Sequence, residues 1–449
     1  MEFGFLTTAL IVIIGIVLGY NVLFSLISWI IRKREAVWYG KQPMSMLRML
    51  VPKEDEDAPT KGPIVMEQIF NTLYGTFKPI GFFRRLFTGE AQPVMSFEIA
   101  HIDGQIYFYS YIPKKYKRLI ESQLYAQYPE LEIEEIEDTI ASALEVSKPF
   151  ESQKKSFQKA IQKYSAEKTS KGFQSMLPGN ICVAELELQQ PIIWPFKTYE
   201  FFVDKDDKTQ VDTLSSLTSS ISKLHHDYDQ AWFQLVIRPQ RPLWQKYSLE
   251  AFELIKKGYF NTRWGGLTKW FVRWYPSPWF WHYWLIKVPI MGTIKLFWKG
   301  FGLMNPVETV NMLEKKEVGF TYWELPNKKL TKIAFQSTIR LGYLSRAGNI
   351  FESRLKVEEM AASFNQFYWA EVNGLQIATI EDTSTRAGMN LYEAMKKRSM
   401  NGPMILGVDE LSTLYHLPMK TLETSNIAWV RAKKLEPPAE IPIPQEFPD

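Results

Sequence analysis

The segment VMSFEIAHIDGQIYFYSYIPKKYKRLIESQLYAQYPELEIEEI, Val94–Ile136, decides the fold class. It opens with two alternating apolar and polar runs, Val94–Ala100 and Gln105–Ile112, separated by a stretch that ends in Asp-Gly. This pattern predicts a β-hairpin, because Asp-Gly readily adopts the positive φ angles of a tight hairpin turn. The pattern of Pro113–Tyr128 predicts a helix with one apolar face, and Leu131–Ile136 returns as a strand with one solvent-facing side. The predicted order is strand, strand, helix, strand.

The same order recurs further along the chain. Ile181–Leu188 and Thr198–Val203 are predicted strands, Val211–Leu224 an amphipathic helix, and Ala231–Arg238 a buried strand. A third piece within residues 332–380 completes or repeats the pattern. Strands that alternate with single helices and hairpins predict an α+β fold built from ferredoxin-like β-β-α-β modules, with helices on one face of each sheet.

The N-terminal stretch Phe3–Ile31 carries no charged residue, and about 20 apolar residues in a helix suffice to cross a bilayer. Arg32, Lys33 and Arg34 follow it, and only Glu2 precedes it. Basic residues stay on the cytoplasmic side, so we expect a single-pass helix in the inner (cytoplasmic) membrane, with the N-terminus outside and the body in the cytoplasm. A secretory signal peptide is the alternative, but its apolar region is shorter, about 7–15 residues, and ends at a small-residue cleavage site.

Composition and motifs argue against chemistry carried by this chain. The net charge of +4 arises from 53 basic and 49 acidic residues, which is too balanced to indicate nucleic acid as a partner of the whole chain. Cys182 is the single cysteine, so an intrachain disulfide is impossible. Neither a P-loop, nor a zinc-binding H-E-x-x-H, nor a G-x-S-x-G nucleophile motif is present. We therefore expect no catalytic residue, no cofactor and no metal site, and a protein that is not an enzyme.

An aromatic and basic segment lies between Glu253 and Glu308, where the sequence has no acidic residue. Trp rings favour the bilayer interface, and Lys and Arg are attracted to anionic lipids, so a membrane-interfacial role is favoured. Core or partner packing and a groove for single-stranded nucleic acid are the alternatives, which leaves direct nucleic-acid contact open. The candidate membrane-interface residues are Trp264, Trp270, Arg273, Trp274, Trp279, Trp281, Trp284, Lys287, Lys295 and Trp298.

These patterns divide the chain into seven parts. A transmembrane anchor is followed by a linker with amphipathic helices, two α+β modules, the aromatic basic segment, a third α+β piece and a Pro-rich tail. The linker includes the charged, Pro-containing stretch Val51–Lys61. The expected boundaries are 1–34, 35–92, 93–150, 151–258, 259–305, 306–430 and 431–449.

Several segments, taken in order, resemble a bacterial family associated with type IV secretion and conjugation. The resemblance is to the region that precedes a hexameric motor ATPase of the DNA-pumping type. It covers most of the chain after the anchor. The matching segments are Met66–Gly75, Ser96–Asp138, Lys197–Leu224, Ala231–Pro239, Phe335–Leu375, Glu410–Pro418 and Asn426–Pro438.

Two departures from this family shape what the resemblance implies. The family's Pro-rich exit, which Leu435–Pro444 resembles, leads into the ATPase, whereas this sequence ends at Asp449. Phe260–Phe301 also replaces a plain polar connection. The resemblance implies a non-catalytic, membrane-bound docking or scaffold component of a type IV secretion or conjugative DNA-transfer apparatus, which positions a separately encoded motor ATPase. A truncated gene, a homo-oligomer, and a general membrane-surface scaffold or binding module unrelated to DNA transfer stay open as alternatives.

Overall fold

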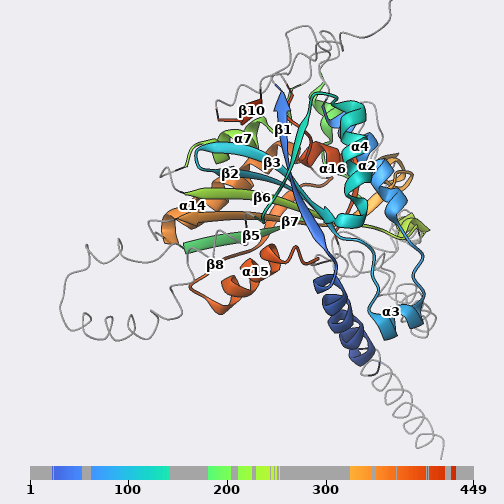
Figure 1. The fold of residues 1–449 in the computed structure, drawn as a ribbon. Helices are drawn as coiled ribbons and strands as arrows, with labels where there is room; N and C mark the ends of the chain where they lie inside the picture. The colour runs from blue at the N-terminus through green and yellow to red at the C-terminus, as the bar shows by residue number, and fades with distance from the viewer. Residues whose placement is uncertain are drawn as a thin grey trace, which may run out of the picture.

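A computed structural model shows a mixed α+β protein built on a ten-stranded sheet that is almost wholly antiparallel (Figure 1). This confirms the α+β class expected from the sequence. Apart from isolated positions, the structure describes residues 25–52, 62–138, 180–203, 211–224, 229–242, 324–345, 350–370, 372–400, 404–419 and 426–430.

The first half of the sheet has the element order strand, helix, strand, strand, helix, strand. Its strands lie in the order β4-β1-β3-β2, and every neighbouring pair is antiparallel. The connection from β2 to β3 is the predicted Asp-Gly turn, with φ angles of 51° at Asp103 and 80° at Gly104. In chain order the elements are β1 (Met44–Pro52), α2 (Pro63–Leu73), β2 (Met95–Ile102), β3 (Gln105–Pro113), α4 (Lys117–Gln127) and β4 (Glu132–Ile136).

The second half repeats this connectivity. Its strands lie in the order β8-β5-β7-β6, again antiparallel throughout. The two halves join edge to edge because β2 pairs with β6, with Glu98 opposite Gln234. In chain order the elements are β5 (Asn180–Leu188), α7 (Ser215–Ser222), β6 (Gln230–Pro239), β7 (Ala334–Ser345), α14 (Ile350–Ala362) and β8 (Leu375–Asp382).

The third piece, which was expected either to complete or to repeat the pattern, shares its strand pairing with the preceding module. The strands expected in the separate parts 151–258 and 306–430 belong to one half, since β5 and β6 from the former pair with β7 from the latter. The part 35–92 also contributes a strand, β1, which pairs with β3 and β4. Pairing between strands that are far apart in the sequence therefore joins these parts.

Two local predictions are wrong. Thr198–Val203 contains the 3₁₀ helix η4 (Tyr199–Phe202), and the backbone N–H of Tyr199 donates to Thr413 Oγ1 at 2.9 Å rather than to a neighbouring strand. Val51–Lys61 does not begin as a linker, because Val51 and Pro52 end β1 and pair in parallel with the short strand β10 (Trp429–Val430).

Helices cover both faces of the sheet, but unequally. Four helices of the two halves, together with α16 (Val408–Leu414), pack on one face, where Phe97, Leu235 and Ile339 contribute to the main core. The opposite face carries α15 (Arg386–Lys396), whose Tyr392 and Met395 join a second, smaller core. Burial of these apolar side chains supplies most of the driving force for folding.

A buried polar row crosses the α15 face of the sheet. Glu98 on β2, Gln234 on β6, Arg340 on β7 and Glu185 on β5 stand opposite one another in register. Gln234 Nε2 donates to Glu98 Oε1 at 3.0 Å, and Arg340 Nη1 donates to Gln234 Oε1 at 3.3 Å. The row therefore continues by hydrogen bonds across the seam between the two halves.

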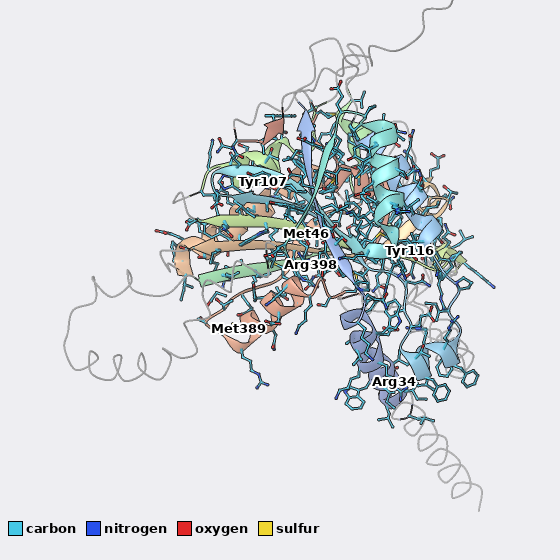
Figure 2. All side chains as sticks on the ribbon, viewed as in Figure 1. Arg34, Met46, Tyr107, Tyr116, Met389 and Arg398 are labelled. Carbon is cyan, nitrogen blue, oxygen red and sulfur yellow. The ribbon has the colours of Figure 1, made fainter. Side chains whose placement is uncertain are left out.

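Arg398, just after α15, contacts this row at Glu98. Its side chain is 2% exposed, and it donates to both oxygens of Glu98 at 3.0 and 3.2 Å and to both oxygens of Asp138. Figure 2 shows it at the centre of the sheet beside Met46. Burial alone would lower the pKa of Arg398, but the Glu98 and Asp138 carboxylates outweigh it and raise that pKa. The residue also has a φ of 49°, a strained conformation for a non-glycine residue that the surrounding contacts must maintain.

We expect Arg398→Met to destabilise the protein by about 3–5 kcal/mol, because it keeps the side-chain volume but leaves Glu98 buried without its cation. Denaturant unfolding in detergent measures the loss. Lys397→Met is the matched control, since it removes only an exposed i,i+4 pair with Glu393 and should cost roughly 0.5 kcal/mol or less. Equal losses in the two variants would contradict a central role for the buried cluster.

Candidate functional site

Several strand ends meet where the chain enters the sheet. Met44 at the start of β1 pairs with Pro113 at the end of β3, and Met95 at the start of β2 pairs with Ile237 near the end of β6. The next neighbour is the start of β7, where Phe335 pairs with Pro239. We call this end of the strands the entry edge.

A helix over residues 25–40 leads into the entry edge. Only residues 41–43 separate it from β1, and they are tied back by hydrogen bonds from Lys41 N to Trp38 O and from Gln42 N to Tyr39 O, at 3.2 and 3.0 Å. Lys114 N donates to Pro43 O at 2.9 Å and fixes the other side of the junction. The helix and the sheet therefore meet at a short hydrogen-bonded turn, which restricts their relative orientation.

A second, short helix, α3 (Phe82–Thr88), lies against helix 25–40 (Figure 1). Arg85 donates to Glu35 Oε1 with Nη2 at 2.7 Å and Nε at 3.2 Å. Arg34, labelled in Figure 2, donates to the Phe87 carbonyl, and Tyr39 OH donates to the Gln92 carbonyl at 2.8 Å. Polar contacts rather than core packing hold α3 in place, because none of its residues is buried.

Gly89 allows the close approach of the two helices. It ends α3 with a φ of 71°, in the left-handed region that favours glycine. A Cβ atom at this position would lie 2.4 Å from the backbone oxygen of Arg34. Both the turn and the contact with helix 25–40 therefore require glycine here.

The end of β6 completes the site. Arg238 Nη1 donates to Tyr39 OH at 3.4 Å, and Arg241 Nη2 donates to the Ile80 carbonyl at 2.5 Å. Burial raises the pKa of the Tyr39 hydroxyl, so Tyr39 stays neutral and can both donate to Gln92 and accept from Arg238. Helix 25–40, the α3 region and the β6 end thus form one connected unit.

The sequence-predicted residues fall into two groups. Arg32, Lys33 and Arg34 are exposed on helix 25–40, one turn or more before the junction with β1. The ten candidate membrane-interface residues, Trp264 to Trp298, lie outside the described residues. The strands on either side of their segment, β6 and β7, pair at Pro239 and Phe335, so both flanks of the segment begin at the entry edge.

Sequence reasoning did not single out α3 or its contacts. A signal was present, since the run FFRRLF places three Phe and two Arg within six residues. A run this short gives no clear periodicity, however, and partners such as Glu35 and Tyr39 lie more than forty residues away in the chain.

The described residues contain no group of three or more His, Cys, Asp or Glu side chains arranged to hold a metal. His416 Nε2 lies 3.1 Å from Asp212 Oδ1 in a buried contact that joins the residues after α16 to those before α7. A pocket of about 70 Å³ beside β5 and β7, lined by Glu185 and Thr338 among others, has room for only a few waters. Within the part of the chain that the structure describes, no helix is both long enough and apolar enough to span a membrane.

Comparison with known proteins identifies one family match. Residues 326–430 match the Domain of unknown function (DUF8128). This range begins within the helix α13 (Glu324–Leu330), ends at β10, and includes Arg340 of the buried row and Arg398, which contacts that row. No curated protein shows significant similarity to the chain.

Gly89→Ala should detach α3 from helix 25–40, because the added methyl group meets the Arg34 backbone. Hydrogen exchange measured by mass spectrometry should show faster exchange across residues 82–92. Gly104→Ala is the control: Gly104 has a similar φ of 80° but nothing within 4 Å of its Cβ position. It should carry only the cost of left-handed strain, roughly 1 kcal/mol, and leave exchange in residues 82–92 unchanged. Unaltered exchange in Gly89→Ala would show that α3 does not depend on this contact.

Proposed function

We propose that this protein is a non-catalytic, membrane-bound docking component of a bacterial type IV secretion or conjugative DNA-transfer apparatus, and that it positions a separately encoded motor ATPase. The observation that carries the proposal is the short, hydrogen-bonded junction between helix 25–40 and the sheet. A protein that holds a motor at a membrane needs a defined orientation, and a long flexible linker would not provide one.

The anchoring part of the proposal rests on the sequence before the junction. The uncharged stretch Phe3–Ile31 runs directly into helix 25–40, and Arg32, Lys33 and Arg34 follow it on the exposed surface of that helix. Under the positive-inside rule, these basic residues support a position of the sheet on the cytoplasmic side of the inner membrane. The flanks of the aromatic segment start from the same edge, which favours contact between its Trp residues and the bilayer.

The docking part of the proposal rests on the two repeated halves. A β-α-β-β-α-β unit with one antiparallel sheet is typical of ferredoxin-like domains, and we propose that each half is one such domain. β10 pairs with the end of β1, at the opposite end of the strand from helix 25–40 (Figure 1). The Pro-rich tail 431–449, which in the resembling family leads to the ATPase, follows β10 directly. The ATPase would therefore dock at the end of the sheet that faces away from the membrane.

Purification of the tagged full-length chain from detergent-solubilised membranes tests this function. We expect the chain in the membrane fraction and, with it, an ATPase that carries a Walker motif. The purified chain itself should not hydrolyse ATP, since it lacks a phosphate-binding loop. Recovery without any ATPase would favour the general membrane-surface scaffold. A chain found only in the soluble fraction, or ATP turnover abolished by a point mutation in this chain, would contradict the proposal.

A further inference from the structure

We propose that α3 is a second lipid contact, in which the rings of Phe82, Phe83 and Phe87 insert into the headgroup region of an anionic bilayer beside the anchor. This inference rests on the membrane anchoring proposed above and adds a specific surface to it. It concerns residues for which the sequence analysis assigned no role.

The three rings are exposed to an unusual degree. Phe82, Phe83 and Phe87 are 49%, 71% and 65% exposed. They contact one another rather than the core: Phe83 and Phe87 stack with ring centroids 6.4 Å apart, and Phe82 meets Phe83 edge-on at 5.6 Å. A cluster of exposed aromatic rings marks an interaction surface, because water contact with so much apolar area is unfavourable.

The position of α3 indicates that the exposed rings contact a membrane. The Phe87 carbonyl accepts from Arg34, and Arg34 follows the last residue of the uncharged stretch, Ile31, by three positions. Three residues advance a helix by about 4.5 Å, less than one turn. If the uncharged stretch spans the bilayer, Phe87 therefore lies at the depth of the headgroups, where amphipathic and aromatic groups settle.

The charge around α3 indicates that the membrane surface it contacts is anionic. Residues 32–35 and 84–90 together carry five cations and two carboxylates. The carboxylates, Glu35 and Glu90, are paired with Arg85 and Arg84 at 2.7 and 2.6 Å. The excess positive charge lies on the same two helices as the rings, and Arg34 contacts the Phe87 carbonyl, so cations and exposed rings occur together as on a surface that binds anionic lipids.

Fluorescence quenching in proteoliposomes tests the proposal. The full-length variant Phe83→Cys is labelled with an environment-sensitive dye and reconstituted in vesicles of phosphatidylcholine and phosphatidylglycerol, with and without spin-labelled lipid. The native thiol gives little background, because Cys182 is buried and its pKa is raised to about 12. Phe351→Cys is the matched control, since Phe351 is 73% exposed and belongs to α14, a helix that lies far from α3 (Figure 1).

We expect spin-labelled lipid to quench the dye at position 83 at least about twofold more than the dye at position 351, with a blue-shifted emission at position 83. Phe87→Cys should behave like Phe83→Cys and provides an independent measurement if one variant does not fold. High salt or the omission of phosphatidylglycerol should reduce the quenching.

Vesicle flotation separates a failure of this inference from a failure of the anchor. If the chain floats with the vesicles but positions 83 and 351 are quenched equally, the anchor stands and the α3 contact is refuted. Oxidative cross-linking between two copies of the unlabelled Phe83→Cys variant, together with no lipid quenching of the labelled variant, would assign the surface to a second copy and also refute it. A chain that does not float would overturn both proposals.

Discussion

The interaction on which the rest of the structure depends is the buried charge cluster of Arg398, Glu98 and Asp138. The edge strands of the two halves, β2 and β6, meet at the seam, and Glu98 and Gln234 sit opposite each other there. Burying Glu98 at 1% exposure is costly unless a cation compensates it, and Arg398 supplies that cation from the end of α15. The guanidinium thus links the segment after α15 to the first half, and Glu98 in turn accepts from Gln234 of the second half.

This constraint extends to the rest of the sheet. Because the halves share hydrogen bonds across β2 and β6, the sheet spans both of them, and β1 and β7 each begin at the entry edge. Helix 25–40 continues into β1, while the flanks of the aromatic segment leave from β6 and β7. The elements proposed to face lipid therefore gather at one end of the sheet, and the C-terminal strand β10 lies at the end of β1 away from helix 25–40.

Local sequence patterns predicted the strands and helices in which the local preference agrees with the tertiary structure. The hairpin around Asp103 and Gly104 is the clearest case, because the residues themselves favour the required positive φ angles. β1 was missed: Met and Leu favour helices, and Arg48 interrupts an apolar run. Its strand conformation comes from distant partners, including the pair between Arg48 and Glu134 on β4. The strand predicted over 198–203 failed for the converse reason, since a contact with Thr413 replaces strand pairing.

For the site, the sequence by itself determined the uncharged N-terminal stretch, the basic residues after it and the aromatic basic segment, because composition alone expresses them. It also determined the α+β class, since alternation and helical periodicity are local properties. Only the tertiary structure decided that two repeated halves form one sheet, that α3 packs on helix 25–40, and that Arg398 pairs with Glu98 three hundred residues away. Such contacts depend on which strand edges and charges meet in space, and separation along the chain carries no information about that.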